Sequence, residues 1–143
     1  MWLKMGIMGV DIMNKNAKII NYGLFVWLIP SLITVILGPF IAAMNIFEIV
    51  SAVAIAVTVI IFSYLYLKGI TENFIKESVL IGISWLIISI VLDIIMVMLG
   101  ISELSLNNYM AYVAPLYVII PAITIGLGLY TNQRRNDAIN AGD

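Results

Sequence analysis

The sequence predicts an all-α protein, a four-transmembrane-helix bundle with both termini on the cytoplasmic side. Of its 143 residues, 63% are hydrophobic and only 10% are charged, whereas a globular domain is nearer half apolar and a quarter charged. The charges are clustered, which leaves four apolar runs close to the roughly 20 residues that a helix needs to cross a bilayer. Runs this long lack the alternation typical of membrane β-barrel strands. We therefore expect a single helical domain.

The expected transmembrane helices lie at about 19–37, 46–67, 79–99 and 110–130. Gly38 and Pro39 are expected to end the first helix, because proline has no amide hydrogen and its ring obstructs the preceding turn. Pro30, Pro115 and Pro121 lie inside the first and fourth runs. We expect each of these three prolines to kink its helix.

The basic residues predict the orientation. All seven fall on one side of the predicted bundle: Lys4, Lys15, Lys18, Lys68, Lys76, Arg134 and Arg135. The loops 38–45 and 100–109, on the other side, contain no Lys or Arg. Because cytoplasmic loops carry the excess of basic residues, the N-terminal segment 1–18 and the tail 131–143 are predicted to be cytoplasmic.

The first 18 residues do not resemble a cleaved signal peptide. The apolar stretch after Lys4 is short, Asp11 interrupts it, and no small-residue cleavage site follows. Translation from Met13 would give a polar, basic start that leads directly into the first span. Two interpretations of residues 1–12 stay open: sequence upstream of the native start, or a short interfacial helix.

Composition also excludes several kinds of chemistry. The chain has no Cys and no His, which excludes thiolate nucleophiles, imidazole bases, His or Cys haem ligands and the usual zinc sites. We therefore expect no metal and no cofactor. The net charge of −1 argues against a nucleic-acid partner, which requires a concentrated basic surface. The acids are scattered over different depths, so we assign no catalytic residue and do not expect an enzyme.

Asp93 is an acid inside the apolar run "ISIVLDIIMVML" at 88–99. Insertion of a central Asp costs about 2.5–3.5 kcal/mol, and each Leu or Ile offsets about 0.3–0.6 kcal/mol. The span can therefore hold the acid, provided that its carboxyl group avoids lipid. Asp93 shares a helix face with Gly82 and Ser89, the kind of residue that packs against other membrane helices. We predict that Asp93 faces protein and is uncharged and hydrogen-bonded near neutral pH.

Hydroxyl groups are the predicted hydrogen-bond partners of Asp93, since no Lys or Arg lies at its depth. The candidates are Ser31, Thr34, Ser51, Ser89, Tyr112 and Tyr117. Three roles for Asp93 stay open at this point: a structural link between helices, a group that takes up a proton or exchanges it for a cation, and catalysis.

Part of the second half has a recognisable pattern: Trp85, Asp93, Tyr109, and "LYVIIPAITIGLG" at 116–128, which contains Tyr117 and Pro121. In these residues the chain resembles a group of small four-span prokaryotic membrane proteins of unknown activity. The resemblance covers residues 85–128 and is moderately specific. It implies the architecture and a prokaryotic plasma membrane, and it draws attention to Asp93, Tyr117 and Pro121, but it implies no mechanism.

These observations favour a small proton- or cation-coupled transporter or channel, with Asp93 as its buried titratable group. Four packed helices fill their own centre with side chains, so a solute pathway would need a second copy, and we expect a homo-oligomer. The alternative is a non-transporting accessory subunit whose helices dock to a larger membrane complex. The expected partners are the lipid bilayer and either further copies or another membrane protein.

Overall fold

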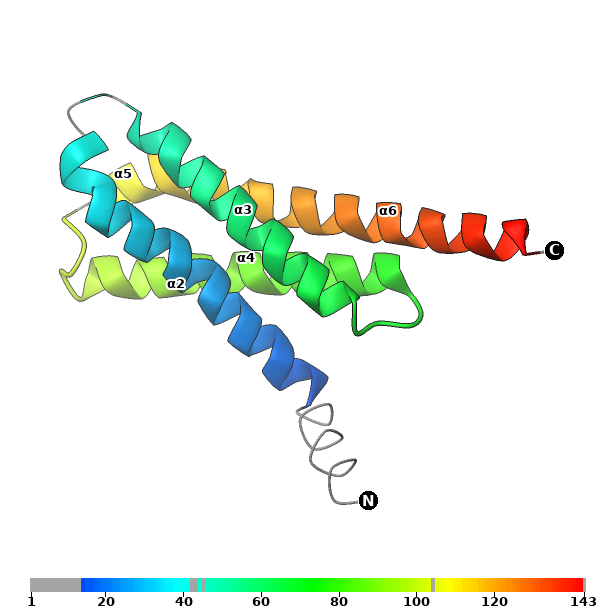
Figure 1. The fold of residues 1–143 in the computed structure, drawn as a ribbon. Helices are drawn as coiled ribbons and strands as arrows, with labels where there is room; N and C mark the ends of the chain where they lie inside the picture. Colours follow the sequence, from blue (N-terminus) through cyan, green and yellow to red (C-terminus); the bar gives the residue numbers. More distant parts are fainter. Residues whose placement is uncertain (1–13, 42–43, 45, 104, 143) are drawn as a thin grey trace, which may run out of the picture.

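The structure, a computed structural model, describes residues 14–41, 44, 46–103 and 105–142, and no strand occurs among them. Four helical stretches are long and apolar enough to cross a membrane. They are α2 (Lys15–Ile41), α3 (Phe47–Leu67), α4 (Phe74–Met98) and the continuous stretch Leu106–Ala141 (Figure 1). The predicted all-α transmembrane bundle is therefore confirmed. Both interpretations of residues 1–12 lie outside the described residues.

The fourth stretch changes its helical form along its length. It comprises α5 (Leu106–Asn108), the π-helical turn η2 (Tyr109–Val113), the 3-10 segment η3 (Ala114–Val118) and α6 (Ile119–Ala141). Pro115 lies at the start of η3, where its missing amide hydrogen interrupts the regular hydrogen-bond pattern. Pro121 lies in the first turn of α6, where amide hydrogens have no partner within the helix. Pro30 is buried within α2.

Several helix ends differ from the prediction. The expected stop at Gly38 and Pro39 is wrong, because α2 continues through both residues to Ile41. A proline so near the end of a helix removes only one hydrogen bond, and a helix keeps the other backbone groups paired where no water is available. The third helix begins at Phe74 rather than near 79, and α6 continues to Ala141 rather than ending near 130. The second helix lies within one residue of its predicted range.

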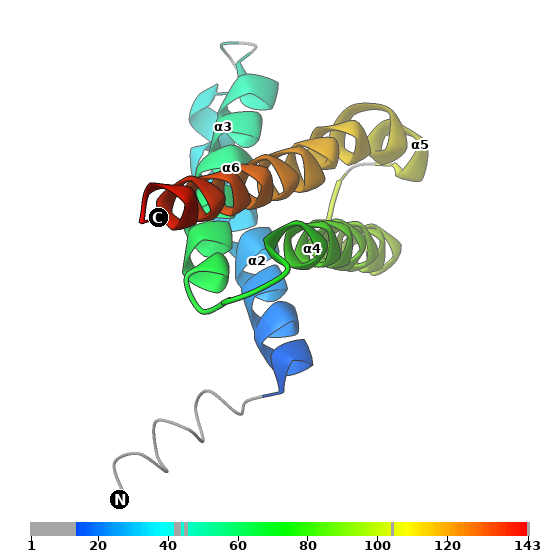
Figure 2. The same ribbon diagram turned by 90° about the vertical axis from the view of Figure 1, so that its right-hand side faces the viewer.

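The bundle consists of two helical hairpins that cross obliquely (Figures 1 and 2). The first contains α2 and α3, and the second contains α4 and α6. Across the crossing, α2 packs on α4 and α3 packs on α6. Between them lie fully buried side chains, among them Val26, Val59, Trp85 and Ile120. The centre of one copy is therefore filled by its own residues, as expected for a small bundle.

Two glycines allow α4 and α6 to approach closely. A Cβ atom on Gly82 would overlap Thr124 Oγ1 and lie 3.0 Å from Pro121 Cα. A Cβ atom on Gly128 would overlap the Ser78 side chain. Small residues serve the same purpose at many membrane-helix contacts, where packing stabilises association.

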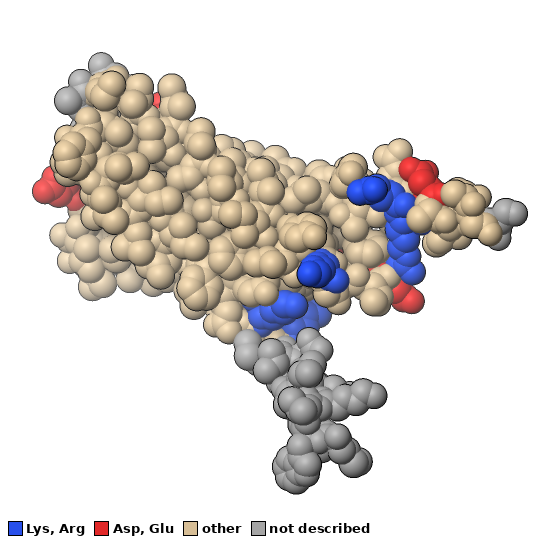
Figure 3. All heavy atoms as spheres, viewed as in Figure 1, with Lys and Arg blue, Asp and Glu red and all other residues tan. Residues whose placement is uncertain are grey.

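The described basic residues gather toward one end of the bundle (Figure 3). They are Lys15, Lys18, Lys68, Lys76, Arg134 and Arg135. This basic end is the one that the positive-inside rule predicts to be cytoplasmic. The orientation in the membrane stays a prediction.

Candidate functional site

Asp93 lies on α4, half-buried, with both carboxylate oxygens hydrogen-bonded to side chains of other segments. The indole Nε1 of Trp27 on α2 donates to Oδ1 at 2.5 Å, and the hydroxyl of Tyr117 in η3 donates to Oδ2 at 2.5 Å. One side chain thus links α2, α4 and the segment that precedes α6.

The irregular segment before α6 supplies two tyrosines to this site. Tyr117 is 7% exposed and Tyr109, in the π-helical turn, is 2% exposed. The Tyr109 hydroxyl is buried near Asp93, without a hydrogen bond of ordinary length and angle within the described part of the chain. A π-helical turn shifts the register of the residues that follow it, and such turns are frequent at functional sites. The result is one carboxylate with an indole and two phenols around it.

Close packing of α2 on α4 brings the Trp27 side chain to Asp93. A Cβ atom on Gly23 would lie 2.9 Å from Trp85 Cδ1 and 2.8 Å from Ile88 Cδ1, so any larger residue would require these two side chains to shift. The Trp85 indole on α4 in turn donates to the Ile19 carbonyl on α2 at 2.9 Å. Each of the two helices therefore donates one indole hydrogen bond to the other. The bond from Trp27 to Asp93 lies two helical turns away from the bond from Trp85 to Ile19.

Of the six predicted partners of Asp93, the structure brings one, Tyr117, to the carboxylate. The hydroxyls of Ser31, Thr34 and Ser51 donate instead to backbone carbonyls of their own helices. Tyr112 is exposed. Ser89 is fully buried one turn from Asp93, and its hydroxyl has no partner within the described residues.

Trp27 was not among the predicted partners of Asp93, all of which are hydroxyl groups. An indole N–H is also a donor, and a buried Trp usually finds it a partner. Trp27 lies well inside the first span rather than at its ends, where tryptophans of membrane proteins usually gather. A tryptophan at that depth was a signal that its N–H meets a polar group, and Asp93 was the available acid.

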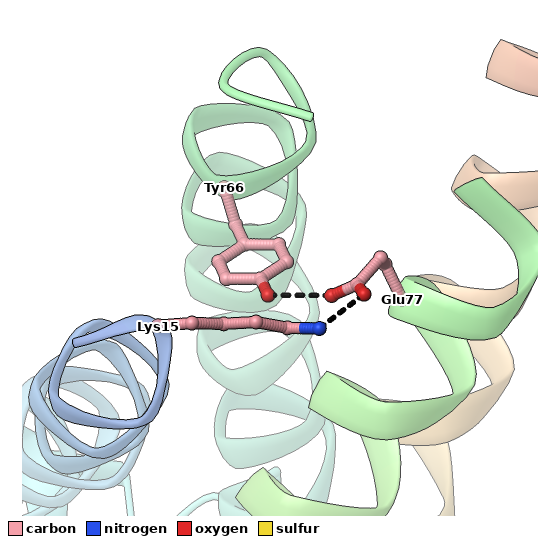
Figure 4. A network of polar contacts seen from close by, with 3 residues as sticks. All are labelled: Lys15, Tyr66 and Glu77. Atoms are coloured by element: carbon pink, nitrogen blue, oxygen red, sulfur yellow. Dashed lines mark hydrogen bonds and ion pairs between the residues drawn. The ribbon is translucent and has the colours of Figure 1, made fainter. Parts of the chain in front are cut away.

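A second acid is buried toward the basic end of the bundle. Glu77 on α4 is 8% exposed, forms an ion pair with Lys15 of α2, and accepts a hydrogen bond of 2.7 Å from the Tyr66 hydroxyl of α3 (Figure 4). The expected start of the third helix near 79 had placed Glu77 outside the spans. The cluster joins three helices and has no contact with the Asp93 site.

A groove of about 670 Å³ runs between α2 and α3. Its walls are aliphatic and aromatic, and no ionisable residue lines it. Its one hydroxyl, that of Thr58, donates to the Ala54 carbonyl. The groove therefore offers nothing to bind a proton or a metal cation, and Asp93 remains the candidate site.

No protein-family model, no curated protein and no solved structure matches this chain. The resemblance noted for residues 85–128 therefore stays a prediction. The function has to be argued from the chemistry of the Asp93 site.

Proposed function

We propose that this multi-pass membrane protein is a proton- or cation-coupled transporter or channel in which Asp93 binds the proton or cation. The observation that carries the proposal is a half-buried carboxylate inside a membrane span that accepts hydrogen bonds from Trp27 and Tyr117 and pairs with no basic residue of the described part of the chain. Acids in such positions are energetically costly, and they mark ion pathways and proton relays.

The two hydrogen-bond donors to Asp93 differ in a way that suits uptake and release of a proton. A tyrosine hydroxyl both donates and accepts, so the Tyr117 contact fits either charge state of the acid. An indole N–H only donates. If the Asp93 oxygen that faces Trp27 carried a proton, that oxygen would itself be a donor and would accept the indole hydrogen less well. Uptake of a proton on that oxygen would loosen the contact between α2 and α4.

A homo-oligomer is part of the proposal. Because Val59, Trp85 and Ile120 fill the centre of one copy, a pathway beside the half-buried Asp93 would run between copies. Symmetric dimers are the commonest closed assemblies. Mass measurement of the protein in lipid nanodiscs tests this, and flux through a protein that remains monomeric would contradict it.

Flux through liposomes tests the function itself. We expect the purified wild type to move protons or monovalent cations, and Asp93→Asn to reduce the rate at least tenfold. Glu103→Gln, which neutralises an exposed acid of the loop between α4 and α5, is the matched control and should leave flux unchanged. Equal flux in wild type and Asp93→Asn would refute the site. A wild type that moves nothing, and that co-purifies with a larger membrane protein, would favour the accessory-subunit alternative.

The proposed location is the plasma membrane of a prokaryote, with the basic end in the cytoplasm. The chain contains no cysteine, so single-cysteine variants report on one position each. An impermeant thiol reagent should label Ser105→Cys in intact cells and Asn140→Cys only in inside-out vesicles. The reverse pattern would contradict the orientation.

A further inference from the structure

A second pocket, of about 260 Å³, lies between the end of α3 and the middle of α6, in the basic end of the bundle. Its apolar walls include Leu67, which is buried, and Leu127, which is partly buried. Tyr64 and Tyr130 also line it and are 63% and 57% exposed. The pocket thus has an apolar floor and exposed aromatic sides.

Two cations line this pocket, and no acid does. They are Lys68, which follows the last residue of α3, and Arg134 of α6. Neither forms an ion pair within the described part of the chain. The Arg134 guanidinium lies over the Tyr130 ring, 5.9 Å from its centroid, which leaves its N–H groups available to an acceptor.

The neighbouring basic residues have other contacts. Lys15 is paired with Glu77. Arg135 donates to the Thr71 carbonyl and lies over the Phe74 ring, so it ties α6 to the connection between α3 and α4. Lys18 lies over the rings of Tyr22 and Tyr66, and Lys76 is exposed and does not line the pocket. Lys68 and Arg134 are therefore the two basic residues of this end that the pocket brings together.

The surroundings of the pocket match the level of lipid headgroups. Tyrosines and basic residues gather where the hydrocarbon of a bilayer meets its polar layer. One turn from Tyr64 toward the apolar part of α3 lies Ile60, which is 46% exposed. A molecule with an anionic head in the pocket could therefore lay a hydrocarbon chain along α3.

We propose that this pocket binds the phosphate of an anionic phospholipid, with Lys68 and Arg134 on the phosphate and the acyl chains against α3. Basic pockets between membrane helices bind such headgroups, and a guanidinium can hold a phosphate by two parallel hydrogen bonds. The lipid would fasten α3 of one hairpin to α6 of the other. The inference does not depend on the role of Asp93.

Lipid retention by the purified full-length chain tests the proposal. Native mass spectrometry from a neutral detergent would compare phosphatidylglycerol with phosphatidylcholine at equal concentration. We expect the wild type to retain phosphatidylglycerol selectively. The double variant Lys68→Gln, Arg134→Gln should bind it about 25-fold more weakly, since each basic residue at an anionic surface strengthens attachment about fivefold. Lys76→Gln, an exposed cation of the same end that does not line the pocket, is the matched control and should bind as the wild type does.

Three results would overturn the proposal. Undiminished phosphatidylglycerol binding by the double variant would place the lipid elsewhere. Equal retention of phosphatidylcholine would remove the role of charge. Displacement of the lipid by glycerol phosphate at equal concentration would assign the pocket to a soluble phosphate. The charge-conserving variant Lys68→Arg, Arg134→Lys should keep the selectivity, and its loss would also count against recognition by charge.

Discussion

Gly128→Ala tests the packing that holds α4 against α6. The added Cβ would overlap both Cβ and Oγ of Ser78 and would lie 3.0 Å from the Phe74 carbonyl oxygen. Neither the Ser78 Cβ nor the Phe74 carbonyl can rotate away, so the two helices would have to separate. Overpacking of this kind costs about 1–3 kcal/mol, and the better helix propensity of alanine offsets at most about 1 kcal/mol. We expect a net loss of about 1–2 kcal/mol in the free energy of unfolding.

The same helix offers a matched control. A Cβ atom on Gly126 would meet nothing within 4 Å, so Gly126→Ala should leave stability unchanged or raise it by up to about 1 kcal/mol. The assay is unfolding by SDS in mixed micelles, followed by circular dichroism. Adding Ser78→Gly should reduce the cost of Gly128→Ala, because it removes the Cβ that the new methyl group meets. Equal effects at 126 and 128, or no relief from Ser78→Gly, would refute the predicted α4–α6 contact.

Two further stability predictions concern the acids in the membrane spans, and both use the same assay. Tyr117→Phe removes one of the two donors to Asp93 and should lower stability by about 1–3 kcal/mol, the cost of leaving a buried polar group unpaired. Tyr112→Phe, at an exposed hydroxyl, should have no effect, and equal losses from the two variants would contradict the hydrogen bond between Tyr117 and Asp93. Tyr66→Phe leaves buried Glu77 without that donor and should likewise cost about 1.5–3 kcal/mol. The Lys15 side chain is 51% exposed, so Lys15→Gln should lower stability by only about 0–1 kcal/mol. A larger loss from Lys15→Gln than from Tyr66→Phe would show that the ion pair, and not the hydrogen bond, stabilises Glu77.

The architecture was predictable because a bilayer constrains a chain more simply than water does. Four apolar runs of sufficient length allow four helices and little else. The inward direction of Asp93 followed from its helix face, since a carboxyl group in lipid is costly and Ser89 and Gly82 mark the packed side. In the structure Ser89 is fully buried and Gly82 meets α6.

Details that depend on the register between helices were not predictable. Gly126 and Gly128 are equivalent as sequence, yet only Gly128 faces a neighbouring helix. The π-helical and 3-10 turns around Pro115 arise from a missing amide hydrogen, but which turns form depends on what the tyrosines contact. The stop expected at Pro39 failed because Pro39 lies in the last turn of α2, where the loss of one amide hydrogen does not prevent the helix from continuing for two more residues.

The choice of partners for the two buried acids was the least predictable part. Lys15 lies 62 residues from Glu77 in the sequence, and Trp27 lies 66 residues from Asp93. Only the crossing of the hairpins brings these residues together. A list of every hydrogen-bond donor near the depth of Asp93 would have included Trp27. Such a list could not have favoured Trp27 over Ser31, Thr34 or Ser51. Those hydroxyls bond to their own backbone.

The most direct test of the central claim is infrared difference spectroscopy of the protein in lipid as the pH is lowered. We predict one carbonyl band of a protonated carboxyl group that is absent from Asp93→Asn and shifted in Tyr117→Phe, because Tyr117 bonds to that group. Our prediction that Asp93 is uncharged near neutral pH requires the band to be present already at pH 7. If no band depends on Asp93 at any pH at which the protein stays folded, the acid does not take up a proton, and the account of Asp93 as an uncharged, proton-exchanging group is wrong.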